Sequence, residues 1–291
     1  MGKLVNTRIW VPFDLALNHP EIYRGTMVYM AIASKTKKGK VGVMSLEDII
    51  YLIGMKPKAG TDGTNYKIAQ TINQLRELGY LEMAPDYFAD GMRMKPKQNR
   101  GFKIPERPKK SKDYAMVYQK AVRDFCNLAR TAYYRVEGEE KDKQIRFSTD
   151  NAVHVYFFIR QRIFREKSNV AVIRRSAISE AVGIAACTVT EITTYLDTMN
   201  FIKKRNVFRK DGPDDAVRET TFYTICSKDE KETQERLDLA TKNYWKQILD
   251  KRDKSAGIGT KSGTSSVSGG SSDDSEWWGE KSKSWAELES A

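Results

Sequence analysis

One pattern of residues occurs twice in this chain. A short apolar helix ends at a glycine, a second helix with an apolar stripe follows, and then come a strand and a basic hairpin. The first copy reads SLEDIIYLIG at 45–54 and NYKIAQTINQLRELGYLEM at 65–83, and the second reads SAISEAVG at 176–183 and CTVTEITTYLDTMNFIKK at 187–204. This order is that of a winged helix-turn-helix, whose second helix can enter a DNA groove. The repeat therefore predicts two such units in tandem.

The spacing within the two copies differs by eight residues. Gly54 and Gly79 are 25 residues apart, whereas Gly183 and Asn200 are 17 apart. The extra residues match the segment KPKAGTDG at 56–63, and insertion into a surface turn costs little free energy. The difference is therefore compatible with a repeat.

The second helix of each copy has apolar residues at steps of three and four. Such steps put the side chains on one buried face. These residues are Ile68, Ile72, Leu75 and Leu78 in the first copy, and Val189, Ile192, Leu196 and Met199 in the second.

Local signals place the other elements. We expect an extended arm over 1–20, helices over 21–34, 113–134, 151–165 and 228–254, and strands over 41–44 and 170–173. A first hairpin is expected to have its tip at Asp90-Gly91 and its return arm at 101–104. A second hairpin is expected to have its arms at 201–209 and 220–226. The predicted class is α+β, mainly α with small β-hairpins, and the Ser/Gly-rich C-terminal tail is expected to be disordered.

The chain divides by composition into five parts. They are an N-terminal winged-helix DNA-binding domain at 1–105, a basic linker and connecting helix at 106–145, a second winged-helix domain at 146–227, a terminal helix at 228–254, and a Ser/Gly linker with an acidic, Trp-containing tail at 255–291.

Positive charge is abundant and clustered. Fifty Lys and Arg against 38 Asp and Glu give a net charge of +12 and a pI near 9.4. Nine of these cations lie between 93 and 112, where Glu106 is the one acid. Such an excess favours an anionic partner, chiefly nucleic acid, because each neutralised phosphate releases counterions.

Composition also argues against several function classes. Cys126, Cys187 and Cys226 are too far apart for a zinc motif, and we expect them to be reduced and structural. His19 and His154 are the only histidines in the sequence. The chain therefore offers almost no histidine ligands for a metal site and almost no histidine base for a Ser-His-Asp triad. We therefore expect no metal, no cofactor and no enzymatic activity.

Membrane segments are not indicated by the sequence. No run approaches the roughly 18–20 apolar residues that a membrane helix needs. The first residues, MGKLVNTRIWVPFD, lack the apolar region of a secretory signal. We therefore expect a cytoplasmic protein with no membrane partner.

In the first copy, polar residues on the outer face of the second helix could read DNA. Asn and Gln side chains can pair with adenine, and Lys can reach guanine or phosphate. The predicted DNA-binding residues are Lys56 and Lys58 in the loop, Asn65, Tyr66, Lys67, Gln70, Thr71 and Gln74 on the helix, and Arg93, Lys95, Lys97 and Arg100 in the hairpin.

In the second copy, the corresponding helix has no Lys or Arg. Its exposed groups would be threonines, and the cations lie in the flanking segments, where they could hold phosphates. The predicted contacts are Arg174, Arg175, Thr188, Thr190, Lys203, Lys204, Arg205 and Lys210. Contact with DNA and contact with a protein, including a second copy of the chain, both remain open for this unit.

The tail carries Trp277, Trp278 and Trp285 among acidic residues. Tryptophans in an acidic, disordered segment are typical anchors for a partner's pocket. Docking on a partner and folding back on the basic body are both compatible with this composition.

Over its first hundred residues the chain resembles the replication initiators and replisome organisers of low-GC Gram-positive plasmids and phages. The resemblance depends on RIWVPFDL at 8–15, RGTMVYMAIAS at 24–34, and SLEDIIYLIG with TINQLRELGYLEM at 71–83. It implies binding of double-stranded origin DNA by the N-terminal unit and recruitment of host replication proteins by the C-terminal part. A winged-helix transcriptional regulator and a protein-binding assembly or partition adaptor are the alternatives.

Overall fold

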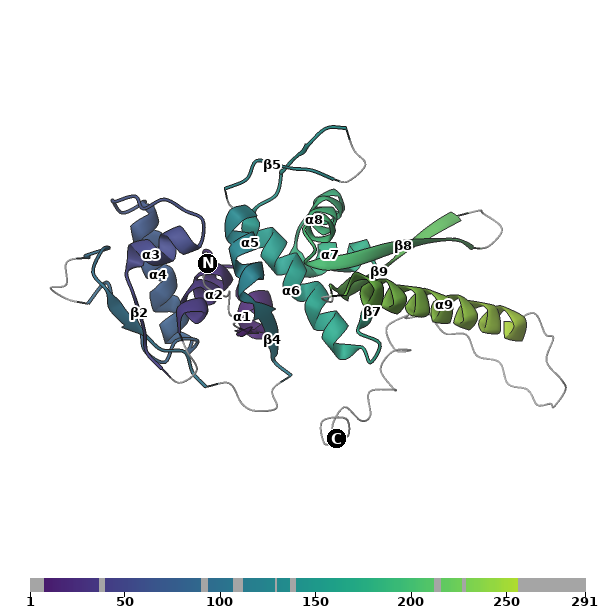
Figure 1. Ribbon diagram of the computed structural model, residues 1–291, viewed down its shortest axis with the longest axis horizontal. Coiled ribbons are helices and arrows are strands. Elements are labelled where there is room, and N and C mark those ends of the chain that lie inside the picture. Colours follow the sequence, from purple (N-terminus) through teal and green to yellow (C-terminus); the bar gives the residue numbers. More distant parts are fainter. Residues whose placement is uncertain are drawn as a thin grey trace, which may run out of the picture. The chain divides into compact units, whose positions relative to one another are not determined.

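The computed structural model describes residues 8–36, 40–89, 94–106, 112–128, 130–136, 140–211, 216–226 and 229–255 (Figure 1). Helices and short antiparallel sheets alternate along this part of the chain, so the predicted α+β class is confirmed. The elements are β1 Arg8–Pro12, α1 Phe13–Asn18, α2 Gly25–Lys35, β2 Gly42–Met44, α3 Leu46–Leu52, α4 Thr64–Glu77, β3 Arg100–Phe102, β4 Tyr114–Tyr118, α5 Gln119–Leu128, β5 Tyr133–Tyr134, β6 Lys143–Gln144, α6 Thr149–Arg165, β7 Val170–Ile173, α7 Arg175–Val182, α8 Ala186–Thr198, β8 Ile202–Asp211, β9 Ala216–Ile225 and α9 Glu230–Ser255. Among the described residues, none of the helices combines the length and apolar character that a bilayer span requires.

The two copies of the sequence pattern share one topology. In each, a helix (α2 or α6) leads to a strand, two helices and a later strand that pairs with the first one (β3 with β2, β9 with β7). In the second copy β7 pairs with β9, and β9 pairs with β8. In the first copy β2 pairs with β3, and Met83 forms an isolated bridge with Lys103 just beyond β3. In both, the strand before the helix pair therefore bonds to the returning arm of the hairpin.

The extra residues of the first copy lie in the turn between its two helices. This turn occupies 53–63 between α3 and α4, whereas only 183–185 separate α7 from α8. Gly183 has φ +71°, a left-handed conformation that costs glycine little. The predicted eight-residue insertion is confirmed.

Two expected elements are wrong. The helix expected over 113–134 is a strand, β4, followed by the shorter helix α5. The arm expected over 1–20 contains strand β1, which pairs with β4, and then helix α1. The aromatic and apolar residues of 114–118 alternate between inside and outside, as β1 does, because the two strands form one sheet with one buried face.

Helix α6 contacts elements of both copies and buries nine of its 17 residues. Val155, Phe157 and Ile159 have no exposed surface, whereas Phe164 is 50% exposed at the end of the helix. The helix contacts α1, α2, α5 and β4 as well as α7, α8, β7 and β9. One hydrophobic core therefore includes residues of both copies, and the predicted domain boundaries at 105, 145 and 227 stay predictions.

Three aromatic rings connect α5 and α6 with the start of the second hairpin. The ring centroid of Phe125 lies 4.4 Å from that of Phe201 and 5.4 Å from that of Tyr156. Polar contacts join α6 to the start of the chain as well: Arg24 Nη1 donates to the Asp150 carboxylate at 3.3 Å, and His154 Nε2 lies 3.2 Å from the Leu17 carbonyl.

Helix α9, the expected terminal helix, packs against the second hairpin between Leu237 and Tyr244. Leu237 is buried with Val170, Val207 and Phe222, and Tyr244 packs its ring against Phe222 at 5.3 Å. An ion pair between Arg205 of β8 and Asp238 of α9, at 2.5 Å, fixes the helix further.

The start of α3 is fixed by a capping box. Ser45 Oγ accepts a hydrogen bond from the Asp48 amide at 3.1 Å, and the Ser45 amide donates to the Asp48 carboxylate at 2.9 Å. The Ser45 hydroxyl and amide hold the pKa of Asp48 below its ordinary value of 3.8. These bonds satisfy amides that a helix start otherwise leaves unpaired.

Replacing Ser45 with Ala should lower the free energy of unfolding by about 1 kcal/mol. Because the pKa of Asp48 is lowered in the folded protein, its contribution is present above the unfolded pKa and is lost as the pH falls through the folded value. Urea titrations should therefore show that the variant has a lower free energy of unfolding than the unchanged protein at pH 7. The difference between the two should become smaller below about pH 4. The control is Ser176→Ala, at an exposed serine on α7. An equal loss of unfolding free energy in this control would contradict the capping role of Ser45.

Phe125→Ala should lower the free energy of unfolding by about 3–5 kcal/mol, because the ring is fully buried between α5, α6 and the second hairpin. Phe164→Ala, at the half-exposed phenylalanine, should cost about 1 kcal/mol or less. Since one core includes both copies, thermal unfolding of either variant followed by circular dichroism should remain a single transition. Two separate transitions in the unchanged protein would contradict the shared core.

Candidate nucleic-acid interface

Helix α4 presents a polar stripe to solvent. Ile68, Ile72 and Leu75 are completely buried, and the exposed residues Lys67, Gln70 and Gln74 lie at steps of three and four on the opposite side. The exposure predicted for these three side chains is confirmed. We call them the α4 face.

Two residues predicted for this face are buried instead. Thr71 is 1% exposed because its hydroxyl donates to the Tyr23 carbonyl at 2.6 Å, where the start of α2 packs against the helix. Asn65 is 7% exposed, and its backbone amide donates to the Lys58 carbonyl at 3.2 Å. Both are therefore part of the packing around α4 and cannot present their side chains to DNA.

The loop before α4 folds back on the helix. A Cβ at Gly63 would lie 2.2 Å from the Lys58 carbonyl oxygen, so only glycine allows the backbone to pass this close. The Gly63 amide also donates to the Gly60 carbonyl at 3.0 Å. Lys56 and Lys58 are exposed on this closed loop, as predicted.

Aromatic rings surround the first turn of α4. Tyr66 is half-buried and meets the ring of Phe88 edge-on, with centroids 5.1 Å apart. The ammonium of Lys67 lies 5.9 Å from the centroid of Tyr23, a residue 40% exposed that sequence reasoning missed. Because Tyr23 lies outside the repeated segments, nothing in the sequence pattern indicated that it borders the α4 face.

The segment after α4 is held against the helix by Asp86. Its carboxylate accepts hydrogen bonds from Arg76 at 2.9 Å and from Asn73 at 3.3 Å. Together with the bond from the Phe88 amide, these hold the pKa of Asp86 at about 2. Phe88 is therefore fixed beside Tyr66.

Of the predicted hairpin residues, Lys95 and Lys97 are exposed. Arg100 is half-buried and donates to Gln98 at 2.8 Å. Arg93 and the predicted tip at Asp90-Gly91 lie outside the described residues.

In the second copy, cations from neighbouring elements reach the exposed side of α8. Arg175 of α7 donates to the Thr190 hydroxyl at 3.2 Å, and Lys204 of β8 donates to the Thr194 hydroxyl at 2.8 Å. Thr190 and Thr194 are one turn apart on the same helix face. We call these four residues the α8 row.

One acidic group, Asp197, lies close to this row. Lys203 Nζ is 4.0 Å from Asp197, the next residue down the same side of α8. Burial raises the pKa of Asp197, while Lys203 and Lys204 oppose this shift. The row therefore combines positive charge with hydroxyl groups, and its charge comes from α7 and β8 and not from α8 itself.

The remaining predicted residues of the second copy are placed differently. Arg174 is exposed at the start of α7, and Thr188 is half-buried. Arg205 is committed to its ion pair with Asp238. The side chain of Lys210, and all of Trp277, Trp278 and Trp285, lie outside the described part of the chain.

The three cysteines are free thiols in different surroundings. Burial raises the pKa of both Cys126 and Cys226 to about 11, so these thiols are protonated at neutral pH. Cys187 is exposed on α8, so the expectation that all three are structural is wrong for this residue. Across the described ranges, no three His, Cys, Asp or Glu side chains are grouped so that they could hold a metal ion.

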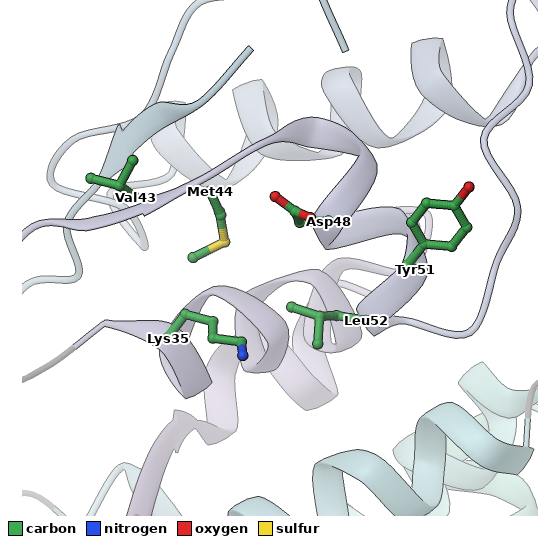
Figure 2. Close-up of a pocket in the computed structure, with 6 residues that line it drawn as sticks. All are labelled: Lys35, Val43, Met44, Asp48, Tyr51 and Leu52. Atoms are coloured by element: carbon green, nitrogen blue, oxygen red, sulfur yellow. The ribbon is translucent and has the colours of Figure 1, made fainter. Parts of the chain in front are cut away.

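An open hollow of about 400 Å³ lies between the end of α2, β2 and α3 (Figure 2). Its charged groups are Lys35 and Asp48, and the Asp48 carboxylate is already bonded within the capping box. Val43, Met44 and Leu52 make the rest of the wall largely apolar, with Tyr51 at one end. This arrangement has no paired nucleophile and base.

Comparison with known protein families and with curated proteins found no match to the chain.

Thr71→Val should lower the free energy of unfolding by about 1–3 kcal/mol, because it leaves the Tyr23 carbonyl without the buried hydroxyl donor. Gln70→Ala, at the exposed neighbour, should change stability by less than about 0.5 kcal/mol. Urea unfolding measures both. Unchanged stability of Thr71→Val together with a loss of duplex binding would contradict the buried role of Thr71.

Proposed function

We propose that the protein is a non-enzymatic, sequence-specific binder of double-stranded DNA with two winged helix-turn-helix units. The observation that carries the proposal is the α4 face. Lys67, Gln70 and Gln74 are exposed on the second helix of a helix pair, beside a strand and hairpin, which is where a winged helix presents residues to the major groove.

The chemistry of the α4 face favours base reading. A glutamine amide can pair bidentately with adenine, and a lysine can reach guanine. Exposed cations lie on both sides of the helix in sequence, at Lys56 and Lys58 before it and at Lys95 and Lys97 after it. They supply the phosphate contacts that orient a protein on the duplex.

The α8 row supports a different role for the second copy. Its hydroxyl and cationic groups can bind phosphate oxygens, but no amide or cationic side chain on α8 is placed to read a base. We infer that α4 reads sequence and that the α8 row binds the DNA backbone.

The biological role that we propose is initiation of plasmid or phage DNA replication. This role depends on the resemblance of the first hundred residues to replication initiators and replisome organisers. In this role the C-terminal tail would recruit host replication proteins. Regulation of transcription would use the same DNA-binding surfaces. Repeated binding sites in or beside the coding sequence would favour replication over transcription.

The test begins with selection of bound fragments from a random duplex library, followed by affinity measurements on a selected and a scrambled duplex. Lys67→Ala with Gln70→Ala should weaken binding to the selected duplex by about 5- to 150-fold, and binding to the scrambled duplex much less. Arg175→Ala with Lys204→Ala should weaken both alike and reduce the salt slope by about one for each phosphate that is no longer neutralised.

Lys242→Ala with Gln234→Ala provides the matched control, because it removes the same residue types as the α4 pair from exposed positions on α9. Its affinities should equal those of the unchanged protein within about twofold. Absence of duplex binding at low salt, or an equal loss in the control, would rule out the proposal.

A further inference from the structure

The sheet formed by β1 and β4 has one buried face. Ile9 lies opposite Val117, and Val11 lies opposite Ala115. Each of these four side chains is at most 2% exposed. Because successive side chains of a strand point to opposite sides, the residues between them lie on the other face of the sheet.

That other face carries exposed aromatic rings. Trp10 lies opposite Met116, and Arg8 lies opposite Tyr118. Trp10 is 36% exposed and Tyr118 is 39% exposed, while Arg8 is also exposed and Met116 is half-buried. Trp10 and Tyr118 are diagonal neighbours across the two strands, a relation that places side chains about 7–8 Å apart on one face.

We propose that this face binds single-stranded DNA, with one base stacked on Trp10, another on Tyr118, and Arg8 beside a phosphate. An exposed indole and phenol are flat surfaces on which any base can stack. Single-strand binding of this kind needs aromatic rings and nearby cations more than hydrogen-bond readout.

Charge favours a nucleic acid over an apolar partner at this face. Lys112 is exposed just before β4, and Lys120 is exposed just after it, although Lys120 pairs with Asp124. Arg8, opposite Tyr118, and Lys112 therefore give a polyanion complementary charge at the two ends of the strand pair.

The geometry favours a single strand over a duplex. In a duplex each base is covered by its neighbours in the stack, so an aromatic side chain reaches its face only after the step is opened. In a single strand the base faces are available. This proposal is independent of duplex reading by the α4 face, because the two surfaces share no residue.

The experiment measures fluorescence anisotropy of a labelled oligothymidylate, about 20 nucleotides long so that it exceeds the site of one stacking surface. The full chain is used at low salt. Trp10→Ala and Tyr118→Ala should each weaken binding by about 5- to 150-fold, and Trp10→Phe should retain most of it. Arg8→Ala should weaken binding and reduce its salt dependence. Affinity for the selected duplex should stay within about twofold.

Two further variants make the result specific. Tyr133→Ala removes a 55% exposed tyrosine from β5, on another sheet, and should leave the affinity unchanged. Trp10→Leu keeps an apolar side chain on the strand but no ring, so it should bind as weakly as Trp10→Ala while retaining the native circular dichroism spectrum.

Several outcomes would overturn the proposal. The first is that the unchanged protein does not bind the oligothymidylate. The second is that the Trp10 and Tyr118 variants bind it as tightly as the unchanged protein does. The third is that Tyr133→Ala loses as much affinity for it as the Trp10 and Tyr118 variants do. Loss of self-association in Trp10→Ala, seen by sedimentation with single-strand affinity unchanged, would assign this face to a second copy of the chain instead.

Discussion

The burial of helix α6 is the constraint on which the rest of the described fold depends. A helix that is apolar on most of its surface cannot face solvent along its length, so other elements must cover it as far as its exposed last turn, which carries Arg162, Phe164 and Arg165. Elements from both copies of the repeat do so, and the rings of Phe125, Tyr156 and Phe201 close the core between them. The α4 face and the α8 row are consequently carried by one packed body, since the described residues as far as Trp245 belong to a single compact unit.

The two copies show how one skeleton can carry different surface chemistry. Their cores need the same apolar spacing, because α4 and α8 each bury one stripe against the rest of the unit. Their exposed sides carry no such requirement. The first copy places an amine and two amides on α4 itself, whereas the second brings Arg175 and Lys204 to threonines of α8 from α7 and β8.

Much of this arrangement follows from the sequence. The closing glycines predicted the ends of α3 and α7 closely, and β7 was expected at its observed bounds. Helical periodicity predicted the burial of Ile68, Ile72 and Leu75 in α4, although Leu78, expected on the same face, is 48% exposed. Strand β4 was missed because its residues also fit helical spacing and its partner β1 lies about a hundred residues earlier. Thr71 was misplaced for a similar reason: periodicity gives the apolar stripe, but the approach of the Tyr23 carbonyl beside it is a tertiary contact. The same holds for the pairing of Arg175 with Thr190.

The closed loop before α4 has a consequence for the thermodynamics of binding. The close passage at Gly63 and the bond from the Asn65 amide to the Lys58 carbonyl restrict the backbone that carries Lys56 and Lys58. An open loop of this length would lose conformational entropy when a ligand ordered it, whereas this loop has given up much of that freedom on folding. Any anion that these lysines hold is therefore bound with a smaller entropic penalty than an unrestrained insertion would impose.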